Sequence, residues 1–406
     1  MKMLPLLLGL SLVAAGIPAL AQEGPVEVPA RPALLQVREN GGLRPNTMAI
    51  VSGAAALNGA SVTVLDRVTL RLWSLRRGET VIQSAPPGFG YPLLTGAIDP
   101  AAPIVSDAVR AALTRGEAAL SELSASIRGA VVGDLLDLEP LTGGTVAVPV
   151  GAIVADQELF GAELMVAKTT AVQLGIDRPF AIMVYGEGLD RVEASVRGSF
   201  FDPAIRIHGL SDDVLTDPVL PIGLVKARFG EFAIRDAGGD QVEIDPAWIE
   251  ANIVDVDLAP LGLFRCHRLL VPYLRGVVSE LERSSLISAL DPADFQLAGG
   301  CYNPRFNRGG DPGYSLSRHA WGIAIDLNPS SNQYGAPPTL PLAIVEVFRR
   351  WGFSWGGTWS TPDGMHFEWR QLPLSYSSSC AELTVMPLYA GGLWYLRPAE
   401  GHCQSG

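Results

Sequence analysis

The stretch "SRHAWGIAIDLNP", residues 317–329, decides the fold of the second half of this chain. Within it, "GIAIDLN" alternates between apolar residues and small or polar ones, and successive side chains of a β-strand point to opposite faces. The apolar positions would enter a core: Ile323, Ile325 and Leu327. Asp326 would stand on the other face, which Gly322 and Ala324 leave uncrowded. The stretch therefore predicts a strand that presents a carboxylate, preceded by a turn that carries His319.

A second stretch, "WGGTWSTPDGMHFEW" at residues 355–369, has the same pattern. In "MHFEW", His366 alternates with apolar residues and would lie on the face opposite them. If the two strands are neighbours, His319, Asp326 and His366 converge as two imidazoles and one carboxylate. Three such ligands, with a fourth position left for water, are typical of a catalytic zinc site.

The water in such a site needs a general base within reach. Asp363, in the turn "TPDG", comes three residues before His366, and Glu368 would share a strand face with that histidine. We expect Asp363 to be the base, with Glu368 as the alternative. A serine or cysteine hydrolase is disfavoured, because the sequence has no Gly-x-Ser-x-Gly elbow and we expect the cysteines to be paired.

The N-terminus has the features of a secretory signal peptide at residues 1–21. Lys2 precedes an apolar run from Leu4 to about Ala15, and "ALA" at 19–21 fits a cleavage site. The run is shorter than the roughly 20 residues that a membrane-spanning helix needs. We expect an exported protein of the cell envelope, periplasmic or extracellular, with no membrane span after signal cleavage.

Export to an oxidising compartment lets disulfides persist. All four cysteines fall in the last part of the chain and none forms a C-x-x-C pair, so a cysteine-ligated zinc is disfavoured. Pairing in chain order joins Cys266 to Cys301 and Cys380 to Cys403, which is one of about three possible connectivities. The formal charge of −12 and the lack of a basic cluster disfavour a nucleic-acid partner.

With 406 residues the chain exceeds one ordinary core, and we expect two regions. Residues 22–245 carry no chemical signature and predict an α/β or α+β region of unknown role. Its expected elements are a helix over 106–136, strands over 61–73, 145–155, 179–186 and 191–200, and a hairpin within 229–244. Beyond it, "PYLRGVVSELERS" predicts a helix. The lone His208 is expected to be structural, and His267 to be structural or exposed.

The two motif stretches form one ordered set, S-x-H-x-x-G-x-A-x-D, then W-G-G-x-W, then D-x-x-H-F-E. This set resembles the zinc D,D-peptidase and L-alanyl-D-glutamate peptidase family of peptidoglycan hydrolases, the VanY- and endolysin-like group of peptidase family M15. The resemblance covers roughly residues 250–370. It implies a small α+β domain in which a central antiparallel sheet carries the metal.

The same resemblance implies roles for individual residues. His319, Asp326 and His366 would be the zinc ligands and Asp363 the catalytic base, where many relatives have Glu. An arginine upstream would hold the substrate: in "GGCYNPRFNRGG" this is Arg305, with Arg308 second.

We therefore expect residues 246–406 to form a zinc peptidase domain with a disulfide-pinned tail, acting on peptidoglycan stem peptides. An L-alanyl-D-glutamate endopeptidase is slightly favoured over a D,D-carboxypeptidase. The alternative is a zinc-stabilised binding module of the cell wall that has lost turnover.

Overall fold

The structure is a computed structural model. It describes residues 34–202, 204–208, 220–294, 300–307, 315–359 and 361–370, and the backbone of two further strands at 383–387 and 394–398. The expected signal peptide and the expected Cys380–Cys403 pair lie outside these residues. Among the helices of the described part, none is both long and apolar enough to cross a membrane.

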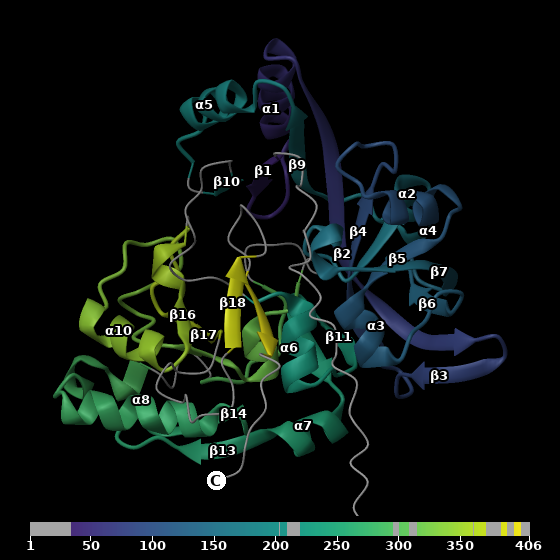
Figure 1. The fold of residues 1–406 in the computed structure, drawn as a ribbon. Coiled ribbons are helices and arrows are strands. Elements are labelled where there is room, and N and C mark those ends of the chain that lie inside the picture. The colour runs from purple at the N-terminus through teal and green to yellow at the C-terminus, as the bar shows by residue number, and fades with distance from the viewer. Residues whose placement is uncertain are drawn as a thin grey trace, which may run out of the picture. The chain divides into compact units, whose positions relative to one another are not determined.

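A ten-stranded sheet organises the first region, and Figure 1 shows its long strand β2. The strands of this sheet are β1 Leu34–Glu39, β2 Ala60–Arg77, β3 Thr80–Ser84, β4 Tyr91–Ile98, β5 Ala118–Ser121, β6 Leu135–Glu139, β7 Val146–Val154, β8 Leu164–Ala167, β9 Pro179–Gly186 and β10 Ile205–His208. The order β2-β4-β8-β5-β7-β6 returns to β2 through a direct β2–β6 pairing, so these strands form a closed ring. Its interior is an apolar core that includes Leu70, Leu120 and Leu138.

The first half of β2 extends the sheet in the other direction, through β9 and β1 to β10. The helices of this region are α1 Pro45–Leu57, α2 Asp107–Thr114, α3 Glu122–Arg128, α4 Lys168–Leu174 and α5 Leu189–Ser199, with a 3₁₀ turn at Asp156–Leu159. Helices α1 and α5 pack on one face of β1 and β9, where Val51 and Val192 meet Val37 and Ile182.

Two expectations for this region are wrong. The helix expected over 106–136 is divided into α2, β5, α3 and β6, because Ala118–Ser121 are fully buried and pair with β7 and β8, which outweighs the helical preference of Ala and Leu. The strand expected over 191–200 lies within α5, whose buried residues Leu189, Val192 and Val196 follow a helical period. The strands expected at 61–73, 145–155 and 179–186 are present as β2, β7 and β9.

A second core runs from Leu220 to Trp369 and surrounds the small sheets of the later chain. Its elements are α6 Ile222–Phe229, β11 Ile234–Gly238, β12 Gln241–Ile244, α7 Pro246–Asn252, β13 Ile253–Asp257, β14 Leu263–His267, α8 Val271–Arg283, a 3₁₀ turn at Ile287–Ala289, η3 Arg318–Trp321, β15 Ala324–Asp326, α10 Leu342–Arg350, β16 Phe353–Trp355, η4 Gly356–Thr358 and β17 His366–Trp369. The expected hairpin and the helix after Pro272 are thus confirmed as β11–β12 and α8. Strands β18 Leu383–Pro387 and β19 Trp394–Pro398 pair with each other.

The three-stranded antiparallel sheet β15-β17-β16 carries both motif stretches, and α8 and α10 lie beside it (Figure 1). The protein is therefore a mixed α+β protein with one large sheet and several small antiparallel ones. The residues that the structure describes fall in one compact unit. The boundary expected at residues 245 and 246 stays a prediction.

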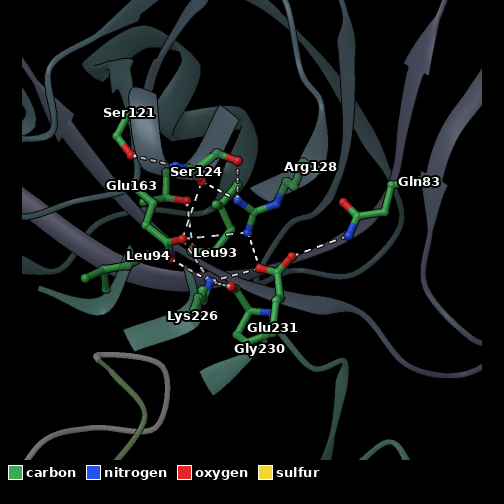
Figure 2. Close-up of polar contacts among 12 residues, drawn as sticks. Gln83, Leu93, Leu94, Ser121, Ser124, Arg128, Glu163, Lys226, Gly230 and Glu231 are labelled. Atoms are coloured by element: carbon green, nitrogen blue, oxygen red, sulfur yellow. Dashed lines mark hydrogen bonds and ion pairs between the residues drawn. The ribbon is translucent and has the colours of Figure 1, made fainter. Parts of the chain in front are cut away.

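A buried ionic network links the large sheet to α6 (Figure 2). Lys226 Nζ donates to both carboxylate oxygens of Glu163, at 2.9 and 2.7 Å, and lies 3.2 Å from Glu231 Oε1. Arg128 forms an ion pair with Glu231 and lies 3.7 Å from Glu163 Oε1. The four side chains are 0–4% exposed. Two cations and two carboxylates therefore balance one another inside the protein.

Candidate metal centre

His319 is positioned by a short 3₁₀ turn, η3. The Ser317 hydroxyl accepts a hydrogen bond from the backbone N–H of His319 and begins the turn. Gly322 ends it with φ +67°, where a Cβ would lie 2.8 Å from the backbone nitrogen of His267, so only glycine fits. The turn directs the imidazole back toward the strand that follows, as the sequence predicted.

Asp326 and His366 face each other across neighbouring strands. Strands β15 and β17 are antiparallel, and the register pairs Asp326 directly with His366. Asp326 Oδ1 lies 3.2 Å from His319 Nε2 and 3.0 Å from His366 Nδ1. All three side chains are buried, and one donor atom of each lies within 4.8 Å of the others. The structure thus brings together the three predicted ligands.

Each imidazole is held in place through its second nitrogen. His319 Nδ1 lies 3.1 Å from the carbonyl oxygen of Cys301, and the disulfide expected between Cys301 and Cys266 is present and fixes that backbone. His366 Nε2 lies 3.3 Å from Glu368 Oε2. Metal-binding histidines commonly carry such outer partners, which fix the ring and its tautomer.

Glu368 therefore lies behind His366 rather than on the side of the other two donors. Its second oxygen, Oε1, is 3.7 Å from the guanidinium of Arg318, which in turn donates to the carbonyl of Leu220. This arrangement suits a residue that orients His366. It disfavours the alternative in which Glu368 is the general base.

The electrostatics of the cluster favour a positive charge among these donors. Burial raises the pKa of Asp326, but the facing imidazoles, His319 first, outweigh burial and hold that pKa well below its usual range. Burial lowers the pKa of His366, but its hydrogen bonds with Asp326 and Glu368 outweigh burial and raise the pKa to about 10. A field that holds a proton on a buried imidazole also favours a metal cation.

Asp363 lies on the loop between η4 and β17. Its backbone N–H donates to the carbonyl of Gly356 at 2.9 Å, and its own carbonyl accepts from the N–H of His366 at 3.1 Å. Its Oδ1 is buried and has no hydrogen-bond partner among the described residues. Burial raises the pKa of this carboxyl, against the opposing charge of His366. A buried carboxylate oxygen without a partner is costly unless a ligand or water engages it.

The W-G-G-x-W motif shapes this loop. A Cβ on Gly356 would lie 2.7 Å from the carbonyl oxygen of Asp363, so the close approach requires glycine. The indole of Trp355 donates to the carbonyl of Gly364 at 2.8 Å, and the ring of Trp359 lies 5.5 Å from that of His366. Trp359 is thus a further residue of the site, and its place in the W-G-G-x-W motif is the signal that marks it in the sequence.

The charge of Arg305 is one of those that oppose the rise in the pKa of Asp363, and the last in size. Arg305 is buried, and its carbonyl accepts from the N–H of Ser317, just before η3. Arg308 lies outside the described residues. Among the described residues, two histidines lie outside the cluster. His267 is fully buried, with its Nε2 3.2 Å from the carbonyl oxygen of Phe229, and His208 lies on β10.

The donor set fits a divalent metal. Two imidazoles and one carboxylate, held by a 3₁₀ turn and two paired strands, match the three-ligand pattern of catalytic zinc sites, which leave one position open. The outer contacts of both imidazoles and the buried, negatively biased surroundings meet the further requirements of such a site.

Comparison with known proteins agrees with this geometry. Residues 311–369 match the peptidase M15 family model described as D-alanyl-D-alanine carboxypeptidase. The match spans η3, β15, β16 and β17, and so every predicted ligand. No curated protein matches the chain. The segment that builds this site therefore belongs to the peptidase M15 family.

Proposed function

We propose that this protein is an exported zinc peptidase that cleaves the stem peptides of peptidoglycan. The observation that carries the proposal is the buried His319–Asp326–His366 cluster within an M15 peptidase segment. Asp363 supports turnover rather than binding alone, because its buried oxygen has no partner among the described residues.

The three ligands would hold one zinc ion, which when bound polarises a water molecule and the scissile carbonyl. Asp363 would accept a proton from the attacking water and deliver it to the leaving amine. Burial raises the pKa of its carboxyl, which brings it closer to the pH at which a general base works best. Glu368 would keep the ring of His366 oriented throughout.

Arg305 would bind a carboxylate of the substrate through a bidentate pair. The effect of its charge on the pKa of Asp363 supports this role. Arg305→Ala should cost roughly 2–5 kcal/mol of transition-state binding if the partner carboxylate is buried in the complex. Metal content should not change.

The bond cut is either the D-alanyl-D-alanine bond or the L-alanyl-D-glutamate bond. The sequence motifs slightly favour the L-alanyl-D-glutamate bond. The description of the matched family model favours the D-alanyl-D-alanine bond. Mass spectrometry of a pentapeptide stem muropeptide after incubation with the zinc-loaded protein separates them. Release of D-alanine alone identifies the carboxypeptidase, and release of a fragment that begins with D-glutamate identifies the endopeptidase.

The alternative is a zinc-stabilised binding module without turnover. The same digest tests it, with Asp363→Asn as the matched control. No cleavage of any stem peptide by zinc-loaded wild type, together with retained binding to peptidoglycan, would favour the binding module and overturn the enzyme.

A further inference from the structure

The sheet extension β10-β1-β9 has two chemically different faces. One is apolar and covered by α1 and α5. The pleat puts alternate residues on the other face, where β1 contributes Gln36 and Arg38 and β10 contributes Arg206 and His208. The register places Arg38 directly opposite Arg206 and Gln36 directly opposite His208. Two guanidinium groups are therefore side by side on one face.

This pairing is unfavourable without a counter-charge, because like charges directly opposite each other destabilise a sheet. Among the described residues no carboxylate forms an ion pair with Arg38 or Arg206. The Nε atoms of both are buried and lack a hydrogen-bond partner there. Burial, and for Arg38 also the charge of Arg206, lowers both pKa values, to about 10 for Arg38. The part of the chain that the structure describes therefore supplies no counter-anion to this pair.

The contacts that Arg38 and Arg206 do have hold them in place rather than neutralise them. The guanidinium of Arg38 donates to His208 Nε2 and lies 5.5 Å from the centre of the Phe180 ring. Burial, and then the charges of these arginines, lowers the pKa of His208 to about 3, so this imidazole is a neutral acceptor. The pair is thus rigid and charged, as a preorganised anion site requires.

The arginine pair borders the loop that carries Asp363. Arg206 hydrogen-bonds the side chain of Tyr334. Asn40 Nδ2 donates to Tyr334 Oη and to Thr361 Oγ1, both at 2.9 Å. Thr361 stands two residues before Asp363. A polar chain therefore connects the arginine pair to the base of the proposed peptidase.

We propose that Arg38 and Arg206 form an anion subsite that binds a second carboxylate of the stem peptide, apart from the one that Arg305 would bind. The inference rests on the proposed function for the identity of its ligand. Planar guanidinium groups match a carboxylate through paired hydrogen bonds, which favours this anion. The subsite would give the region before residue 245 a role in substrate selection.

The test compares three stem pentapeptides: one with both α-carboxylates free, and two in which either the D-glutamate or the C-terminal carboxylate is an amide. One monoamide lacks the carboxylate that Arg305 would bind, and the other lacks the carboxylate that the arginine pair would bind. With the monoamide that lacks the carboxylate for the arginine pair, the KM of the wild type should be about tenfold higher than with the diacid, with kcat unchanged. Arg38→Gln and Arg206→Gln should raise the KM of the diacid and lose this discrimination. Arg191→Gln, at an exposed position of α5, is the matched control and should behave like wild type.

Calorimetry separates the subsite hypothesis from the peptidase hypothesis. It measures peptide binding to Asp363→Asn, in which turnover should be strongly reduced. Carboxylate-dependent binding that is lost in the Gln variants, without cleavage by wild type, would keep the subsite and overturn the peptidase. Cleavage with equal KM in wild type and both Gln variants would keep the peptidase and overturn the subsite. Tighter binding of inorganic phosphate than of the diacid would overturn the peptide ligand. Arg38→Lys retains the charge but not the paired hydrogen bonds, and should retain part of the discrimination that Arg38→Gln loses, which distinguishes charge loss from misfolding.

Discussion

Two buried charged clusters of this protein differ in how their charges are satisfied. At Glu163, two carboxylates meet Lys226 and Arg128, and every charged partner comes from the chain itself (Figure 2). At Asp326, the carboxylate meets two imidazoles, with Glu368 and Asp363 close by. The first cluster is electrically complete, whereas the second still favours a cation.

The difference separates a structural cluster from a functional one. Burial raises the pKa of Glu163, but Lys226 and Arg128 outweigh it and lower the pKa, so the cations of the network favour the ionised form of this carboxyl. The negative charge of the cluster around His366 is balanced only when the cluster binds a proton or a metal. The arginine pair of β1 and β10 is the opposite case, since it favours an anion.

The largest expected effect comes from removing a proposed ligand. Wild-type protein should contain about one zinc per chain, and His319→Ala or His366→Ala should remove both the zinc and the activity, because two ligands hold a metal poorly. Metal analysis and a stem-peptide assay measure the two properties. Full zinc content in both variants would rule out this site.

Removing the base should separate metal from turnover. Asp363→Asn keeps all three ligands, so zinc should remain while turnover falls by about 10²–10⁴-fold. The same metal analysis and assay apply. Wild-type rates in this variant would return the role of base to Glu368, and Glu368→Gln is the matched comparison.

Breaking the complete cluster should affect stability instead. Glu163→Gln leaves Lys226 and Arg128 with excess buried positive charge and should lower the free energy of unfolding by about 3–5 kcal/mol. Chemical denaturation measures the change, and the folded fraction should bind zinc normally. Pairing it with Lys226→Met should recover part of the loss. Unchanged stability in Glu163→Gln would show that the Glu163 cluster does not stabilise the fold through its balanced charges.

Removing an outer partner of a ligand should have a smaller effect. Glu368→Gln keeps a hydrogen-bond acceptor near His366 Nε2 but removes the charge, and should weaken zinc affinity by about 10–100-fold. A competition titration with a chelating dye measures the affinity. Equal affinity in variant and wild type would show that Glu368 does not support the metal.

The smallest expected effect is a pH dependence of stability. Burial lowers the pKa of His267 to about 4, so the unfolded chain binds a proton that the folded protein does not between that pH and about 6.5. Stability is fully present above pH 6.5 and decreases as the pH falls toward 4. As the pH falls from 7 to 6, this residue should lower the free energy of unfolding by about 0.7 kcal/mol. His267→Gln should reduce the slope of unfolding free energy against pH by that amount; an equal slope would contradict it.

The sequence predicted the site better than the surrounding fold. Strand alternation placed Asp326 and His366 on the faces opposite the apolar residues, and the pairing of β15 with β17 confirmed that the two strands are neighbours. The long helix expected over 106–136 was wrong, because the residues that form β5 have helical composition and are strands only through their pairing with β7 and β8. Local propensity is weak compared with the burial of a whole strand.

By itself the sequence determined which side chains can act as ligands and base, because their spacing fixes the faces of short strands and one tight turn. The tertiary structure alone decided which groups support them. Glu368 lies behind His366, the Cys301 carbonyl holds His319, and Arg38 and Arg206 meet across β1 and β10 although 168 positions separate their numbers. Contacts between residues so distant in the chain depend on how sheets close and pack, which no local pattern encodes.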